Sequence, residues 1–140
     1  MSFTQLVYAS KPFGFDRPTL NGILSDASRL NPPNDITGAL ICRADMYLQL
    51  LEGPKQAVEA TYQRITQDDR HVEVQRLVDK PTDHRLFASW AMRDDPARSW
   101  MWTQKEVESG AISQATEDEI VAVFERLAAE PPEGNGVTSG

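Results

Sequence analysis

The chain has 140 residues with 21 acidic and 14 basic side chains, which gives a formal net charge of −7. This length fits one domain of ordinary size. The acidic charge disfavours nucleic acid as a partner, because sequence-independent binding needs a basic face. The lone Cys42 excludes an intrachain disulfide. The N-terminus lacks a signal-peptide pattern, and no apolar run approaches the roughly 20 residues that span a bilayer, so we expect a cytoplasmic protein without membrane contact.

The N-terminal part predicts a strand followed by an amphipathic helix. Residues 3–9 are β-branched and aromatic, which is typical of a strand. A loop that contains a proline and a glycine follows over residues 10–17. Apolar residues then recur at helical spacing over residues 18–30. Asn31 precedes two prolines, which cannot continue the helical hydrogen bonds, and the helix is expected to end there.

The middle of the chain predicts a hairpin and a second helix. Residues 36–42 and 46–51 are apolar runs joined by a short polar turn. The second run is nearly all apolar, which indicates a central strand covered on both faces. From Val58 onward, apolar residues at helical spacing predict a helix that ends near Asp68.

Two further strands and two helices are expected after residue 70. The strands lie over residues 72–78 and 86–92, with a turn over residues 80–83 between them. One short helix is expected over residues 104–109. A second, clearly amphipathic helix begins at the capping box formed by Thr116 and Glu119.

This order of elements predicts an α+β fold. The first six elements follow the ferredoxin-like βαββαβ plan, and a fifth strand extends the mixed sheet. Two helices cover one face, and the two C-terminal helices are expected on the other face, where their apolar stripes can be buried. The predicted organisation is a main domain over residues 1–95, a two-helix extension over residues 96–130 and a disordered tail over residues 131–140.

Gln49 is the most informative polar residue, because it is the only amide in an apolar central strand. An unsatisfied buried amide costs roughly 1–3 kcal/mol, so this side chain must find partners. One interpretation is a core glutamine bonded to backbone or water, and the other is an amide that faces a ligand. Tyr8 lies on the strand expected to neighbour Gln49. It is either a half-buried tyrosine with a solvated hydroxyl or a partner of that amide.

Two further polar positions carry the same ambiguity. Asn31 is either a helix cap or an amide that hydrogen-bonds a ligand between the helices. The segment 68–71 is either a solvated, charged helix end or an anchor for a polyol or phosphate chain. Dinucleotide and phosphate-loop motifs are absent from the sequence, and two isolated histidines favour neither a hydrolase nor a metal site.

Taken in order, six segments of the chain resemble the BLUF (blue light using flavin) photoreceptor domain, and together they cover about residues 3–94. The matching segments are residues 6–10 (LVYAS), 28–31 (SRLN), 36–40 (ITGAL), 48–54 (LQLLEGP), 68–71 (DDRH) and 85–92 (RLFASWAM). The glutamine-containing segment between a Thr-Gly strand and an Arg-His helix end is the most specific of them. One departure is Pro32, where many members carry a second asparagine.

The resemblance implies a flavin held non-covalently between the two helices, usually FAD, although FMN or riboflavin can take its place. Tyr8 would be the light-driven electron and proton donor, and Gln49 the amide that switches between Tyr8 and the flavin. Asn31 would hold the ring edge. The remaining contacts implied for the flavin come from Ile23, Leu24, Arg29, Ile65, Asp68, Arg70 and His71. Trp90 and Met92 would relay the signal from the fifth strand.

The resemblance further implies a sensor and not an enzyme. No cyclase, phosphodiesterase or DNA-binding module accompanies the segments, so the chain resembles a short, free-standing member that signals to an unidentified downstream protein. The signal would leave through the fifth strand or the C-terminal helices, and dimerisation through those helices stays open. The alternatives are a ligand-free ferredoxin-like regulatory or dimerisation domain and a small acylphosphatase-like hydrolase.

Overall fold

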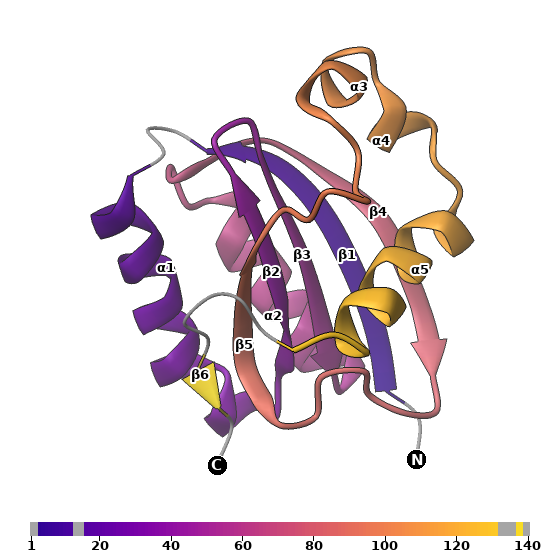
Figure 1. Ribbon diagram of the computed structural model, residues 1–140. Helices are drawn as coiled ribbons and strands as arrows, with labels where there is room; N and C mark the ends of the chain where they lie inside the picture. Colours follow the sequence, from indigo (N-terminus) through magenta and orange to yellow (C-terminus); the bar gives the residue numbers. More distant parts are fainter. Residues whose placement is uncertain (1–2, 13–15, 132–136, 139–140) are drawn as a thin grey trace.

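The structure is a computed structural model that describes residues 3–12, 16–131 and 137–138, and a mixed β-sheet forms its centre (Figure 1). The sheet order is β4-β1-β3-β2-β5-β6. The β2–β5 pair is parallel and the other pairs are antiparallel. The α+β, ferredoxin-like prediction is confirmed. The elements are β1 (Phe3–Pro12), α1 (Arg17–Leu30), the 3₁₀ helix η1 (Pro32–Asn34), β2 (Thr37–Arg43), β3 (Met46–Gly53), α2 (Lys55–Thr66), β4 (His71–Thr82), β5 (Trp90–Pro96), α3 (Gln104–Glu108), α4 (Ala111–Gln114), α5 (Glu117–Ala128) and β6 (Val137–Thr138).

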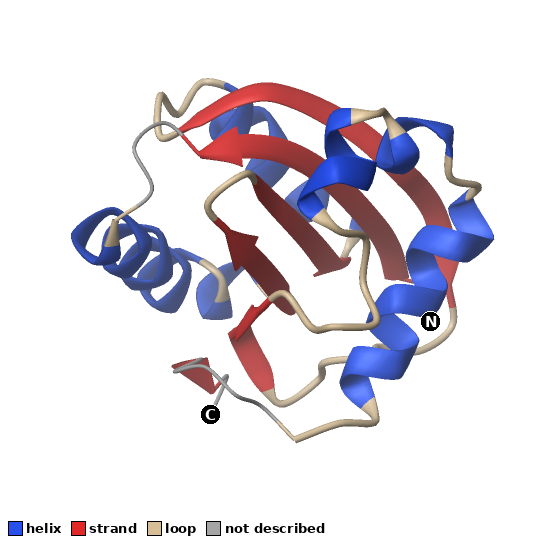
Figure 2. Cartoon of the chain, turned by 45° about the horizontal axis from the view of Figure 1, so that its top comes forward, coloured by secondary structure: helices blue, strands red, loops and turns tan. Residues whose placement is uncertain are grey.

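Helices cover both faces of the sheet (Figure 2). On one face, α1 and α2 pack against a core that includes Leu6, Leu40 and Leu51. On the other face, α5 packs through its buried apolar residues, including Phe124. Every residue of β3 is buried, as expected for a central strand covered on both sides. The sheet therefore separates two cores, and successive apolar residues of β3 alternate between them.

The helix boundaries follow the local signals in the sequence. Asp16 is the N-cap of α1 and accepts a hydrogen bond from the Thr19 backbone N–H at 2.8 Å. The predicted capping box of α5 forms, with Thr116 and Glu119 each bonding the other's backbone N–H. In the described part of the chain, none of the helices combines the length and the apolar character needed to cross a bilayer.

The boundaries of the last two main strands differ from the prediction. β4 continues through the segment predicted as a turn, because it is an edge strand and the missing N–H of Pro81 costs no ladder bond there. β5 begins only at Trp90. The predicted start at Leu86 is wrong, because the buried carboxylate of Glu52 accepts the backbone N–H groups of Leu86 and Phe87 at 2.6 and 2.9 Å.

The C-terminal part contains more structure than the sequence predicted. The short helix α4 lies between the two predicted helices. Val137–Thr138 forms β6 and pairs with Trp90 and Met92 of β5, within the segment expected to be disordered. The rest of that expectation, over residues 132–136 and 139–140, lies outside the described residues.

Of the two glycines in the described sheet, Gly38 of β2 lies closer to neighbouring backbone than Gly53. A Cβ at this position would lie 1.9 Å from the carbonyl oxygen of Leu50. A β-carbon at Gly22 of α1 would instead meet only the flexible end of Arg70, at 3.1 Å. We expect Gly38→Ala to lower the free energy of unfolding by about 3 kcal/mol or more, and Gly22→Ala to change it by less than about 1 kcal/mol. Denaturant unfolding of both variants tests this, and equal effects would contradict the close-approach argument.

Candidate functional site

The site is centred on a buried hydrogen bond between two neighbouring strands. The antiparallel register of β1 and β3 places Tyr8 directly opposite Gln49. Both side chains are buried, and the Tyr8 hydroxyl donates to Oε1 of Gln49. Burial, with a smaller contribution from the Asp68 carboxylate, raises the pKa of Tyr8 well above its ordinary value. The phenol is therefore protonated at physiological pH and bonded to one defined acceptor.

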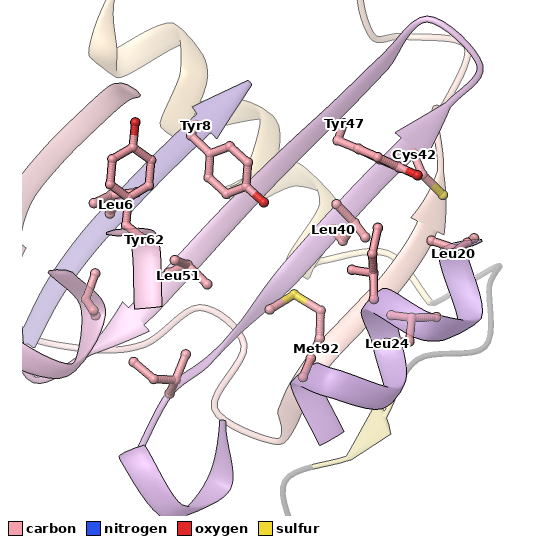
Figure 3. Close-up of a cluster of buried hydrophobic side chains, with 14 residues drawn as sticks. Leu6, Tyr8, Leu20, Leu24, Leu40, Cys42, Tyr47, Leu51, Tyr62 and Met92 are labelled. Atoms are coloured by element: carbon pink, nitrogen blue, oxygen red, sulfur yellow. The ribbon is translucent and has the colours of Figure 1, made fainter. Parts of the chain in front are cut away.

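The other end of the Gln49 amide contacts β5. Its Nε2 donates to the thioether sulfur of Met92 at 3.2 Å, and Figure 3 shows the Tyr8 hydroxyl and the Met92 sulfur directed toward the same part of the sheet. A thioether is a weak acceptor, so this donor is available for a stronger one. Trp90 packs instead against the core on the α5 face. Of the two expected relay residues, Met92 is the one that contacts Gln49.

Asn31 connects helix α1 to the same strand. It caps the C-terminus of α1, and its side chain is almost fully buried. Its Nδ2 donates to the carbonyl oxygen of Ala91 at 2.8 Å, one residue before Met92. Asn31 is therefore both the predicted cap and a direct link between α1 and β5.

A cavity of about 180 Å³ lies between α1 and α2. Eight of the predicted site residues line it, namely Ile23, Arg29, Asn31, Gln49, Ile65, Asp68, Arg70 and His71. Tyr8 and Leu24 do not, because both lie within the core on the α1–α2 face. Sequence reasoning missed the lining residues Asp26, Ala27, Leu30, Leu51, Thr61 and Arg64. Asp26, Ala27 and Thr61 each lie three or four residues from a predicted residue of the same helix, and that periodicity could have identified them.

Arg70 joins two acidic residues in the lining of this cavity. The guanidinium of Arg70 bonds Asp26 of α1 at 2.6 Å and, through its Nε, Asp68 at 2.9 Å. Arg70 lowers the pKa of both carboxyl groups. The segment interpreted either as a solvated helix end or as an anion anchor thus lines the cavity and links the residue before β4 to α1.

His71 is a neutral imidazole at physiological pH. Burial lowers its pKa to about 4, a larger effect than the opposing charge of Asp68. Its Nδ1 lies 2.9 Å from the hydroxyl oxygen of Ser10. The ring packs against Tyr8 and Tyr47, with centroids 5.8 and 5.0 Å apart. His71 thus joins the cavity to the aromatic group around Tyr8.

Comparison with known proteins identifies the family. The family model described as sensors of blue-light using FAD, the BLUF family, matches residues 3–93, and the chain belongs to this family. The photoactivated adenylate cyclase subunit beta of Euglena gracilis is 36% identical over 92 residues, which are 65% of this chain and 10% of that protein. The blue light- and temperature-regulated antirepressor BluF of Escherichia coli is 34% identical over 91 residues, 64% of this chain and 22% of that protein.

Solved structures agree with this assignment. The dark-state structure of the BLUF protein BlrB has 27% sequence identity and a TM-score of 0.71, and the match covers 91% of this chain and 96% of that one. The photo-activated state of BlsA matches with a TM-score of 0.81 at 21% identity, over 95% of this chain and 99% of that one. The second likeness supports the fold alone. The curated relatives are much longer than the part this chain matches, with shares of 10% and 22%.

The burial of His71 predicts a pH dependence of folding. Its pKa falls from 6.5 in the unfolded chain to about 4 in the folded one, so between these values the unfolded state binds more protons. The free energy of unfolding of the ligand-free protein should therefore decrease as the pH drops from 6.5 to 4, by roughly 2–3 kcal/mol from this residue. Unfolding titrations of His71→Gln should show a flatter dependence. The exposed His84 is the control, and an equal flattening in His84→Gln would contradict the assignment.

Proposed function

We propose that this protein senses blue light with a flavin, of which FAD is the expected form and FMN or riboflavin are alternatives, bound non-covalently between α1 and α2. The observation that carries the proposal is the Tyr8–Gln49–Met92 contact at the wall of the cavity. In the proposed division of the chain, residues 1–95 form the sensor and residues 96–130 the output extension. The chain transmits a signal to a downstream partner and does not itself catalyse a reaction.

The residues around the cavity fit a flavin. The ring is flat and largely apolar with one polar edge, and Ile23, Leu51 and Ile65 supply apolar walls. Asn31 and Gln49 supply amides for the polar edge. The cavity is smaller than the roughly 300 Å³ at which ligand pockets usually begin. Because Arg70 bonds Asp26 on α1, we infer that flavin binding requires the Arg70 side chain to move away from Asp26.

The chain's own residues supply the donor and the switch. A bound flavin would act as a strong one-electron oxidant once it is excited by blue light. Tyr8 would give up an electron to the excited flavin, and its hydroxyl proton would leave along the hydrogen bond to Oε1 of Gln49. The electron and the proton would both return to Tyr8 afterwards. The Gln49 amide then settles with its donor and acceptor rearranged, by rotation or by tautomerisation, and this changes its contact with Met92 on β5.

The decisive experiment is an absorption spectrum in the dark and under blue light. We expect the purified or reconstituted protein to be yellow, to release its flavin on heating or in acid, and to show a small, reversible red shift. The shift should survive Cys42→Ser. Burial raises the pKa of the Cys42 thiol to about 12, and the thiol donates to Asp94 at 3.3 Å, so no reactive thiolate is available for an adduct. A colourless protein that takes up none of FAD, FMN or riboflavin would falsify the proposal.

Substitutions in the central pair separate a switch from a packing role. Gln49→Leu leaves the buried Tyr8 hydroxyl without its acceptor, so we expect a loss of about 1–3 kcal/mol of stability in the ligand-free protein. Tyr8→Phe should act similarly by removing the donor. The double variant should recover part of both losses, because neither polar partner remains.

Both single variants should keep the flavin and lose the red shift, because one lacks the redox-active hydroxyl and the other lacks the amide that rearranges. Thr61→Val, which changes the cavity wall without removing a hydrogen-bond partner of Tyr8 or Gln49, is the matched control and should keep the shift. A folded, yellow Gln49→Leu protein with an intact red shift would leave Gln49 as a core amide only.

A further inference from the structure

The face of β5 that points away from the cavity carries a buried group of charges. Met92 packs on the α1–α2 face, whereas the Arg93 guanidinium lies 5.8 Å from the ring centroid of Phe87, in the core on the α5 face. Arg93 and Asp95 are joined by a bond of 2.7 Å, from Nε to Oδ2, and their side chains are 4% and 0% exposed. A buried ion pair of this kind contributes little net stability, so a role other than stabilising the fold has to explain its presence.

This ion pair is bonded to the end of helix α5. Nη2 of Arg93 donates to the backbone carbonyl of Glu130 at 2.8 Å. Arg98 donates to the other oxygen of Asp95 at 2.7 Å and to the Glu130 carboxylate at 3.0 Å. The indole N–H of Trp100 donates to the same carboxylate oxygen at 3.1 Å. Two arginines thus bond Glu130, two residues beyond the last residue of α5, where positive charge is favoured.

We propose that this network of Arg93, Asp95, Arg98 and Glu130 couples the switch at Gln49 to the C-terminal end of α5. The coupling rests on the proposed light-sensing function. Gln49 contacts Met92 on one face of β5, and the next residue, Arg93, bonds Glu130, just beyond the C-terminus of α5, on the other face. A shift of β5 along or about its axis displaces the Arg93 guanidinium.

The response of the network is set by its geometry. Arg93 bonds Asp95 and the Glu130 carbonyl at once through a rigid planar fork, so it cannot follow a shift of β5 and keep both bonds. Loss of the bond to Glu130 frees the last turn of α5. Trp100, which shares the Glu130 carboxylate, reports this change directly.

The test follows the indole N–H signal of Trp100 by NMR, and amide exchange over residues 127–130, in the flavin-loaded protein in the dark and under blue light. In the wild-type protein we expect the Trp100 signal to move and exchange of these amides to accelerate about fivefold, at the low end of typical couplings between sites. The Trp102 indole, outside the network, should not move.

Arg93→Lys keeps the buried positive charge but cannot hold both acceptors, so it should retain the red shift at the flavin and lose the Trp100 response. If this variant fails to fold, Glu130→Ala serves instead, because Glu130 is 30% exposed and the change removes the carboxylate that Arg98 and Trp100 share, so the Trp100 response should be lost. The matched control is Arg126→Gln, which removes the cation 4.2 Å above the Trp100 ring without touching the network and should keep the response.

Several outcomes would overturn the coupling. A normal red shift with unchanged Trp100 and α5 signals in the wild-type protein is one, and a full Trp100 response in both Arg93→Lys and Glu130→Ala is another. An absent red shift would refute the sensor function, and the coupling is then tested in the dark with Met92→Leu. That change at the Gln49 contact should move the Trp100 signal, and the added Arg93→Lys should suppress the movement. An unmoved Trp100 signal in Met92→Leu would overturn the coupling whatever the flavin does.

Discussion

A tyrosine hydroxyl and a glutamine amide share a hydrogen bond inside an apolar sheet, and the arrangement of the site follows from the need to keep that bond buried and defined. In water the bond would exchange with solvent, whereas between two covered strands it has one donor and one acceptor. The antiparallel register of β1 and β3 fixes which residues face each other, and a slip by one residue would move Tyr8 to the opposite face. The short hairpin and the close approach at Gly38 hold β2 against β3 beside this pair.

The same sheet explains how chemistry on one face can influence structure on the other. From Met92 onward, successive residues of β5 alternate between the two faces, so Met92 lies beside Gln49 while Arg93 and Asp95 lie on the α5 side. A sheet covered on one face would expose these charges to water, where an ion pair is screened and costs little to break. Burial makes the Arg93–Asp95 pair sensitive to small displacements, because the alternatives to the bonded geometry are unsolvated charges.

Much of this arrangement was predictable from the sequence because local patterns and the global fold agree. The amphipathic spacing of α1, the apolar hairpin and the capping box at Thr116 each appear where the sequence placed them. The neighbouring positions of Tyr8 and Gln49 followed from the strand order of a ferredoxin-like sheet. The start of β5 did not, because the Glu52 carboxylate, distant in sequence, binds the backbone at Leu86 and Phe87.

The site itself was harder to predict where side chains act over long sequence separations. The segment at Arg70 was expected to be either a solvated end or an anion anchor, and its pairing with Asp26 depends on how α1 lies against β4. Arg64 carries no local signal that distinguishes it from a surface charge on an amphipathic helix. The sequence also did not predict that the charged residues of β5 are buried in the sheet. A run of arginine and aspartates is more typical of a solvated turn than of a buried strand.

The buried charges on β5 allow the contact between β5 and the α5 side to exist in two distinct bonded states. A purely hydrophobic contact between β5 and α5 would tolerate small sliding movements with gradual changes in energy, because burial is non-directional. A network of directed hydrogen bonds does not tolerate such sliding, because each bond is made or lost within a narrow range of distance and angle. The side of β5 that faces α5 therefore converts a small displacement into a discrete change of bonding. Such a discrete change is what a switch needs if a rearranged amide on one face is to alter a helix on the other.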